Sequence, residues 1–240
     1  MERRTIMVTG ATSGIGRSIA NLFSNKDWNL VLIGRKKEAL AELQKEYNQT
    51  EVITYSMDLS ETESISSVFE DLRERGIKLD GLVHCAGMEG SLSPVRSVKQ
   101  SSLDLLMKLH YEAFVELGRL FYKKTASNEG SGIIVISSLA ALMCQKNSID
   151  YSASKAAVNA AVRVMSKEFL KRNIRVNGIM PANVDTPMCD RLKSLVEIET
   201  IQPMGMIDPI HIAYLTEFLM SEKARFITGA LIPVSAGMEY

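Results

Sequence analysis

The chain has 240 residues, enough for one domain with a large core. Hydrophobic residues make up 46% of it and charged residues 23%, with 28 basic and 28 acidic side chains that cancel. This balance is typical of a globular protein and gives no electrostatic argument for binding nucleic acid or an anionic membrane surface.

Short apolar segments alternate with longer amphipathic ones along the chain. In chain order, the pattern predicts a strand over 5–9, a helix over 14–25, a strand over 30–33, a helix over 36–47, a strand over 52–57 and a helix over 61–74. It continues with a strand over 81–84, a helix over 102–124, a strand over 133–137, a helix over 151–171, a strand over 175–180, a helix over 209–220 and a strand over 230–234. This alternation predicts one doubly wound α/β domain over residues 1–240, with a seven-stranded parallel sheet and helices on both faces. Ligands of such sheets bind at the carboxyl ends of the strands.

The first predicted strand ends in a glycine-rich turn, Thr9-Gly10-Ala-Thr-Ser-Gly14-Ile-Gly16. Gly10 permits a tight exit from the strand, Gly14 lets a backbone approach a pyrophosphate, and Gly16 allows close packing of helix on strand. The N-terminus of the next helix presents free N–H groups to phosphates. A turn without a ligand is the alternative, but the position between strand and helix favours a dinucleotide site.

Tyr151 and Lys155 lie four residues apart in a predicted helix and therefore share one face of it. The reference pKa of a phenol is about 10, and a nearby cation lowers it. The pair therefore indicates a general acid/base, although this spacing is common on solvated helices. Ser138, at the end of the apolar run 133–136, strengthens the catalytic interpretation.

Together these features resemble the short-chain dehydrogenase/reductase family over essentially the whole chain. Its nucleotide motif matches residues 9–16, and its catalytic Ser, Tyr and Lys match Ser138, Tyr151 and Lys155. Segments 84–87, 174–188 and 226–237 resemble further motifs of the family. The resemblance implies that Tyr151 exchanges a proton with the substrate oxygen, Ser138 orients that oxygen, and Lys155 lowers the pKa of Tyr151 and holds the nicotinamide ribose.

The resemblance also implies a set of residues that contact the cofactor. They are Gly10, Thr12, Ser13, Gly14, Ile15, Gly16, Arg35, Asp58, Leu59, Ala86, Gly87, Tyr151, Lys155, Pro181, Val184 and Thr186.

The expected cofactor is NADP(H). NAD-selective relatives carry an acid at the end of the second strand, where this chain has Gly34 followed by Arg35. A guanidinium binds a 2′-phosphate bidentately. The alternative for residues 35–37 is a solvated basic start to a helix. Asp58 is expected to face the adenine amino group by resemblance, and it also suits the cap of the following helix.

Three residues depart from the family pattern: His110, Cys85 and Ala182. His110 stands where the family has an Asn in a proton relay. It is either a substituted relay, because imidazole passes protons, or a histidine packed in a helix. Cys85 replaces the usual Asn, and Ala182 replaces the Gly expected beside the nicotinamide.

The resemblance is closest to 3-oxoacyl-acyl-carrier-protein reductases of fatty acid biosynthesis, so a carrier-protein thioester is one expected partner. Arg172 matches a basic position that meets the acidic carrier near the active-site mouth, but Glu129 reverses the charge at another. The alternative substrate is a free ketone, sugar or other hydroxy compound. An NADP-binding regulator without catalysis is a third interpretation, opposed by the intact Ser138, Tyr151 and Lys155.

The substrate pocket is expected to be largely apolar. The segments 139–150, 88–90 and 188–206 are its predicted walls. The candidate side chains are Leu142, Met143, Met188, Leu192, Leu195, Val196, Ile198 and Met204.

A homotetramer is expected, with a dimer as the alternative. The two long helices make two-fold contacts in the family, and small residues on the second permit close approach of its copy. These residues are Ala153, Ala156, Ala157, Ala160 and Ala161. Residues 236–240 are expected to cross to another neighbour.

No metal site is predicted, because Cys85, Cys144 and Cys189 lack the spacing of metal ligands. An odd number of cysteines favours a reducing, cytoplasmic location. No signal peptide and no apolar run near the roughly 20 residues of a membrane span are found in the sequence.

Overall fold

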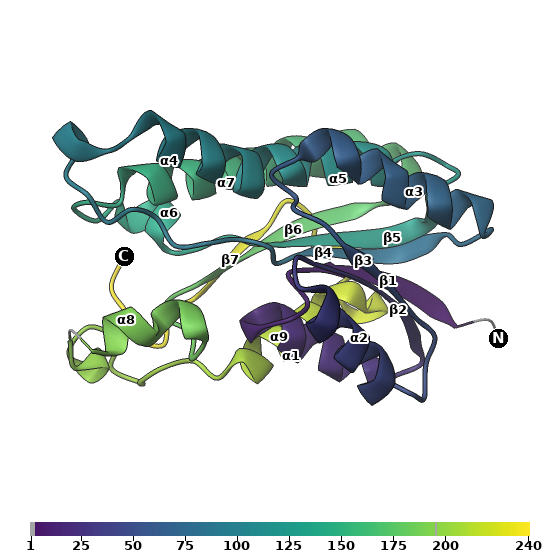
Figure 1. Ribbon diagram of the computed structural model, residues 1–240, viewed down its shortest axis with the longest axis horizontal. Coiled ribbons are helices and arrows are strands. Elements are labelled where there is room, and N and C mark those ends of the chain that lie inside the picture. Colours follow the sequence, from purple (N-terminus) through teal and green to yellow (C-terminus); the bar gives the residue numbers. More distant parts are fainter. Residues whose placement is uncertain (1–2, 195) are drawn as a thin grey trace.

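The computed structural model describes residues 3–194 and 196–240, which form a parallel sheet between two layers of helices (Figure 1). The strands are β1 Arg4–Thr9, β2 Trp28–Gly34, β3 Val52–Ser56, β4 Leu79–His84, β5 Ser127–Ile136, β6 Arg175–Pro181 and β7 Leu231–Val234. Their order in space is β3-β2-β1-β4-β5-β6-β7, and every neighbouring pair is parallel. The chain direction across the sheet reverses between β1 and β4, so a crevice is expected at the carboxyl ends of these strands.

The helices divide between the two faces of the sheet (Figure 1). One face is covered by α1 Gly14–Ser24, α2 Lys37–Glu46 and α9 Pro209–Met220, and the other by α3 Ile65–Glu74, α4 Gln100–Leu106, α5 Ala113–Phe121 and α7 Ile149–Glu168. Two short helices, α6 Ala140–Met143 and α8 Asp190–Lys193, follow β5 and β6. The predicted fold class and all seven predicted strands are confirmed.

The predicted continuous helix over 102–124 is wrong in its middle. A wider π-helical stretch, Met107–Glu112, separates α4 from α5. Such stretches are rare and occur often at functional sites. The extra residue turns His110 into the interior, where its side chain is 1% exposed.

The sheet buries alternating residues against the two helical layers. Ile6 and Val8 of β1 pack toward α1 and α9, whereas Met7 packs toward α5. Phe23 in one layer and Phe114 and Phe121 in the other are among the largest fully buried side chains. Each such side chain contributes about 1.5–3 kcal/mol by leaving water, so the two layers hold the strand ends firmly.

The ends of β1 and β4 are joined by one side chain. The Thr9 hydroxyl accepts hydrogen bonds from the backbone N–H groups of Cys85 and Ala86, both at 3.1 Å, and it bonds His84 Nδ1 at 2.9 Å. Gly10 follows with a φ of +66°, and a Cβ there would lie 2.9 Å from the Ala86 nitrogen. The turn therefore needs glycine at position 10, both for its conformation and for this close approach.

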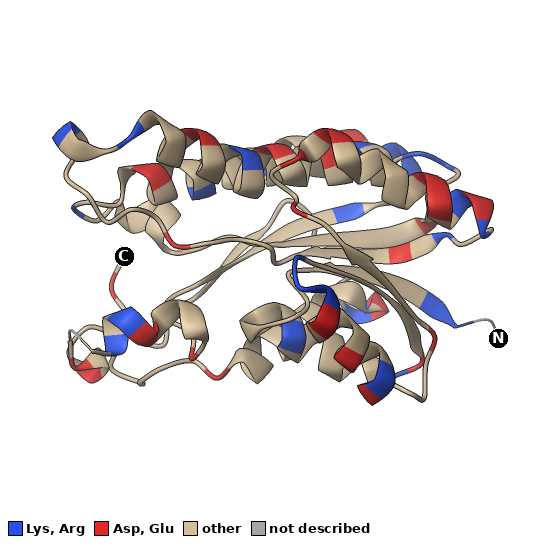
Figure 2. Cartoon of the chain, in the orientation of Figure 1, with Lys and Arg blue, Asp and Glu red and all other residues tan. Residues whose placement is uncertain are grey.

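Charges of both signs are scattered over the outer faces of the helices, and the strands carry few of them (Figure 2). Within residues 3–194 and 196–240, no helix combines the length and apolar character needed to cross a membrane.

Candidate active site

A cavity of about 280 Å³ opens at the carboxyl end of the sheet. Ser138, Tyr151 and Lys155 all line it, so the structure brings the predicted trio together. A second hollow, of about 370 Å³, lies at the opposite end of the sheet among charged residues such as Arg3, Glu51 and Asp80. That hollow contains none of the trio, and the first cavity is therefore the candidate active site.

Tyr151 sits in the first turn of α7, with Ser138 facing its phenol from the loop after β5. Burial raises the pKa of Tyr151 to about 12, and the hydrogen bond from Ser138 opposes that rise. The Ser138 hydroxyl also accepts the Ala140 N–H at 3.1 Å, which fixes its rotamer. Both hydroxyls therefore line the same cavity, where they can form hydrogen bonds with a substrate oxygen.

Lys155 lies below Tyr151 on the same helix face and is 6% exposed. Its ammonium donates to the Ile136 carbonyl at 2.9 Å and lies 5.7 Å from the centre of the Tyr151 ring. Burial lowers the pKa of Lys155 to about 8. The lowering of the Tyr151 pKa expected from Lys155 is not seen, because burial dominates and the ammonium is held by the end of β5.

His110 has both ring nitrogens committed to hydrogen bonds. Nε2 accepts the Met88 N–H at 3.1 Å, so the proton lies on Nδ1, which donates to the Ser154 hydroxyl at 2.9 Å. Ser154 in turn donates to the Tyr151 carbonyl. Burial lowers the pKa of His110 to about 2, so the ring stays neutral. This arrangement favours the packed histidine over the proton relay, since neither nitrogen is available to a passing proton.

Residues 87–91, called the strap below, cross the catalytic helix at its first turn. One end is held by His110 through the Met88 N–H, and the other by Asp150, whose carboxylate accepts the Ser91 N–H at 2.9 Å. A Cβ on Gly90 would lie 2.8 Å from the Tyr151 Cβ and 2.7 Å from Asp150 Oδ1. Only glycine lets the strap pass this close to the tyrosine.

Asp150 anchors the strap because its carboxylate is saturated with hydrogen bonds. It is 1% exposed and also accepts from the Ser102 hydroxyl and the Tyr151 N–H. Burial alone raises the pKa of Asp150, but the hydrogen bonds from Ser102, Ser91 and Tyr151 hold it below its usual value. The sequence predicted 88–90 and 139–150 as walls of the pocket but not the contacts of Asp150 with Ser91 and Ser102, because these partners are distant in the chain and carry no local motif.

The glycine turn has the shape that a pyrophosphate requires. A Cβ on Gly16 would lie 2.3 Å from the Gly10 oxygen, so α1 packs directly on the strand exit. Ser13 precedes α1 without a capping hydrogen bond from its side chain, which leaves the first N–H groups of the helix to other partners. Gly14 has a φ of +51° and contacts Thr186 from the loop after β6. These features fit a dinucleotide.

The predicted cofactor residues fall into three groups: those that line the cavity, those that form the glycine turn, and those farther away. Seven line the cavity itself: Ile15, Gly87, Tyr151, Lys155, Pro181, Val184 and Thr186. Gly10, Thr12, Ser13, Gly14 and Gly16 form the adjoining turn, and Ala86 packs against it. Leu59 is 3% exposed and belongs to the core, so only its backbone faces a ligand.

Arg35 and Asp58 lie beyond the carboxyl ends of β2 and β3. Arg35 is exposed and makes no side-chain hydrogen bond or ion pair with the described residues. A Cβ on Gly34 would meet the Thr12 methyl at 2.9 Å. Hydrogen bonds from the Ser60 N–H and hydroxyl hold the pKa of Asp58 low, with a further contribution from Arg35. Asp58 therefore closes a local turn and does not cap α3, which begins at Ile65.

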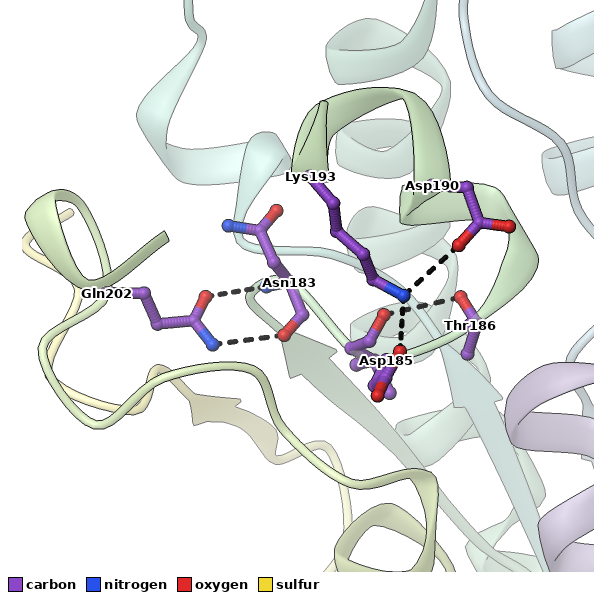
Figure 3. Close-up of polar contacts among 7 residues, drawn as sticks. Asn183, Asp185, Thr186, Asp190, Lys193 and Gln202 are labelled. Atoms are coloured by element: carbon purple, nitrogen blue, oxygen red, sulfur yellow. Dashed lines mark hydrogen bonds and ion pairs between the residues drawn. The ribbon is translucent and has the colours of Figure 1, made fainter. Parts of the chain in front are cut away.

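The segment after β6 is held together by polar contacts among its own residues (Figure 3). The buried Gln202 amide accepts from the Asn183 N–H at 2.9 Å and donates to the Asn183 carbonyl at 3.0 Å. Lys193 bridges Asp185 and Asp190. These contacts hold Thr186 over the glycine turn and place α8 beside the cavity.

The predicted apolar walls are confirmed in part. Met143, Met188 and Leu192 line the cavity, whereas Leu142, Val196, Ile198 and Met204 do not, and Leu195 lies outside the described residues. Ile201, within the predicted wall 188–206, also lines the cavity, and Leu92 and Met238 are lining residues outside the predicted segments. The described residues contain no group of acids, histidines and cysteines placed to hold a metal ion.

Comparison with known proteins identifies the class. A family model described as enoyl-(acyl carrier protein) reductase matches residues 10–239. The chain belongs to the short-chain dehydrogenase/reductase family, whose members are oxidoreductases that act on alcohols and carbonyls with a nicotinamide cofactor.

Individual relatives differ in substrate. A 3-oxoacyl-[acyl-carrier-protein] reductase of Thermotoga maritima is 26% identical, over 99% of this chain and 98% of the relative. The crystal structure of a glucose/ribitol dehydrogenase from Brucella melitensis superimposes with a TM-score of 0.92 and 30% identity, covering 100% of this chain and 98% of the other. A 4-hydroxyisoleucine dehydrogenase complexed with NADH gives a TM-score of 0.90 at 27% identity, covering 98% of both chains.

The buried histidines predict a stability that falls on acidification. Burial lowers the pKa of His84 to about 3 and that of His110 to about 2, so both are neutral when folded and take up protons only when unfolded. Their stabilising contribution is therefore present above pH 6.5 and is lost as pH falls toward the folded pKa values, by about 2 kcal/mol per histidine at pH 5. The measurement is the free energy of unfolding by denaturant at pH 7 and pH 5.

His110→Asn should reduce this loss by one histidine's share, and His211→Asn, at an exposed position, should leave it unchanged. Equal acid sensitivity of the two variants would contradict the neutral, buried state of His110.

Proposed function

We propose that this chain is an NADP(H)-dependent oxidoreductase that interconverts a carbonyl group and a secondary alcohol in a free small molecule. The observation that carries the proposal is the hydroxyl pair of Ser138 and Tyr151, held in one cavity beside the glycine turn. The bound nicotinamide would supply or accept the hydride. Tyr151 would hold and transfer the proton at the substrate oxygen, while Ser138 orients that oxygen.

The choice of NADP(H) rests on Gly34 and Arg35. No carboxylate stands at the end of β2 to repel a 2′-phosphate, and the exposed Arg35 side chain is available to bind one. Arg35 also lies within electrostatic reach of Asp58, which keeps a negative charge beside it. One related dehydrogenase was crystallised with NADH, so the preference must come from residues of this chain.

The contacts and the position of Arg172 favour a free substrate over one bound to a carrier protein. Its guanidinium donates to the Tyr122 carbonyl and, at 2.7 Å, to the Ser127 carbonyl, so it holds the amino end of β5. Arg172 lies just after α7, at the end of the helix opposite Tyr151. At a rise of 1.5 Å per residue, the two residues are about 30 Å apart along the helix axis. In one chain Arg172 is therefore far from the active-site mouth. Glu129 accepts from Asn173 near the same end and adds a negative charge.

A 3-oxoacyl-acyl-carrier-protein reductase is the second candidate, supported by the similarity to such a reductase along the full length of the chain. Arg172 would serve a carrier only at the site of a neighbouring copy. Oxidation of NADPH with a panel of free ketones, 3-oxoacyl thioesters of coenzyme A and the same acyl groups on carrier protein distinguishes the two. The proposed function requires turnover of a free ketone, and activity restricted to carrier-bound groups would overturn it.

We also propose that the protein forms homo-oligomers. Ala153, Ala156 and Ala160 face outward on α7 together with the exposed Val164, which suits a close two-fold contact. Tyr214 and Phe218, exposed and one turn apart on α9, would supply the further contact that a tetramer needs. Residues 236–240 contribute less than expected, since Ala236 and Gly237 pack on Pro203 and Met204 of their own chain.

The unpaired cysteines support the expected reducing, cytoplasmic setting. Cys85, Cys144 and Cys189 are all free thiols in the described chain.

For the cofactor, Arg35→Ala should weaken binding of NADPH by about 1–3 kcal/mol through loss of a charge-assisted pair, and should leave binding of NADH almost unchanged. Fluorescence titration gives both dissociation constants. Lys36→Ala is the matched control, because Lys36 is an exposed neighbouring cation whose loss should be milder. Equal affinity of the unmodified protein for the two cofactors would exclude the NADP(H) assignment.

For catalysis, Tyr151→Phe should lower turnover by about a hundredfold or more, because the proton donor is lost, while the cofactor still binds. Steady-state kinetics and cofactor titration measure the two effects separately. His110→Ala should be milder, since His110 holds the strap and passes no proton. Near-native turnover in Tyr151→Phe would refute the mechanism.

For assembly, light scattering at micromolar concentration should give a tetramer, with a dimer as the smaller unit that α7 alone supports. Val164→Glu would place like charges on both sides of the two-fold contact and should produce smaller species. A stable monomer of the unmodified chain would rule out both interfaces.

A further inference from the structure

Among the described residues that line the active-site cavity, one is an acid: Glu89, in the middle of the strap. The cavity is otherwise largely apolar, with Met88, Leu92, Met143 and Met188 around it. The Glu89 carboxylate makes no hydrogen bond or ion pair with the described residues, and its side chain is only partly exposed. A carboxylate in apolar surroundings without a partner is costly, and a ligand that donates hydrogen bonds to it removes that cost.

The backbone that carries Glu89 is held on both sides. Its two neighbours in the strap are tied down, Met88 by the His110 ring and Gly90 by its close approach to Tyr151 and Asp150. Glu89 also acts electrostatically on Tyr151 and on Cys189, and it raises the pKa of each. Glu89 therefore lies next to the residue that packs on Tyr151, and its side chain lines the same cavity as the phenol.

The bases of the cavity do not neutralise Glu89. Lys155 is committed to the Ile136 carbonyl, and burial lowers its pKa to about 8. Arg191 also lines the cavity, but its side chain is exposed and forms no ion pair with Glu89. A partner for the carboxylate is therefore expected from the substrate.

We propose that Glu89 determines the substrate class: it binds a hydrogen-bond donor, an ammonium or a hydroxyl group, on the first or second carbon beside the reacting carbon, and rejects a carboxylate there. The remainder of such a substrate is apolar, because the cavity around it is lined by methionine and leucine side chains. This inference rests on the proposed reduction of a free carbonyl compound and specifies its substrate.

The test uses two series of hexyl ketones, substituted on the first or on the second carbon beside the carbonyl. Within each series the compounds differ only in the substituent at that carbon, which is hydrogen, hydroxyl, ammonium or carboxylate. With the full chain and NADPH, kcat/KM should be about tenfold or more higher for the ammonium and hydroxyl compounds than for the unsubstituted ketone. It should be lowest for the carboxylate, which faces a like charge.

Glu89→Gln keeps the shape of the side chain and its hydrogen-bonding oxygen but removes the charge. The advantage of the ammonium compound should then fall by about tenfold, the penalty on the carboxylate should disappear, and the advantage of the hydroxyl compound should survive. Glu42→Gln, on the exposed face of α2, is the matched control and should behave as the unmodified protein. An equal response to all four substituents, or the same ranking in Glu89→Gln, would overturn the proposal.

Measuring the affinity of the ketones without turnover tests this inference independently of the proposed function. Calorimetry with the cofactor-loaded Tyr151→Phe variant measures the affinity of the same ketones without turnover, again with and without Glu89→Gln. If the affinities follow the expected ranking but the unmodified protein reduces none of the ketones, the proposed function fails and the inference stands. If the ketones are reduced but neither kcat/KM nor affinity depends on the substituent, the inference fails alone.

Discussion

The contact between the ends of β1 and β4 is the constraint on which the site depends. The Thr9 hydroxyl ties the backbone of Cys85 and Ala86 to the last residue of β1, and Gly10 then turns away against Ala86. The close approach fixes the glycine turn relative to the strap, which begins at Gly87. The strand order reverses between β1 and β4, so both the dinucleotide and the substrate are expected to bind at this junction. The positions of the residues that would contact them therefore depend on it.

The strap and α7 form two sides of the cavity, and different contacts hold each of them in place. The strap runs from Gly87 over the first turn of α7 and is held by His110 and Asp150. Lys155 donates a hydrogen bond to the Ile136 carbonyl at the end of β5, so α7 is tied to the sheet as well as packed on it. Asp150 and His110 each bind both the strap and α7. A displacement of the strap would therefore change its position relative to Tyr151.

The sequence predicted what local pattern encodes. Strand–helix alternation predicted the fold, the spacing of Gly10, Gly14 and Gly16 predicted the phosphate turn, and helical spacing placed Tyr151 above Lys155. It could not predict the environment of these groups, because that depends on partners far away in the chain. Asp150 binds Ser91 and Ser102, at separations of 59 and 48 residues. The π-helical stretch that buries His110 likewise has no periodic signal in the sequence.

Burial pushes Tyr151, Lys155 and His110 toward their neutral forms. Lys155 is lowered to a pKa of about 8 and Tyr151 is raised to a pKa of about 12, so an ion pair between phenolate and ammonium is disfavoured in this chain. Tyr151 is therefore protonated at neutral pH, the state from which a phenol can donate a proton.

Glu89 links this proton to the choice of substrate. Burial is the main cause of the raised pKa of Tyr151, and the negative charge of Glu89 adds a smaller contribution that makes the phenol a weaker acid. An ammonium group bound to Glu89 would cancel that contribution and lower the pKa of Tyr151, since a nearby positive charge favours the phenolate. A hydroxyl would do so less, and a carboxylate would act in the opposite direction. The same side chain would then improve both the binding of a donor-bearing substrate and the acidity of the group that protonates it. Discrimination of this kind appears in kcat as well as in KM, because the interaction acts on the transferring proton and not on binding alone.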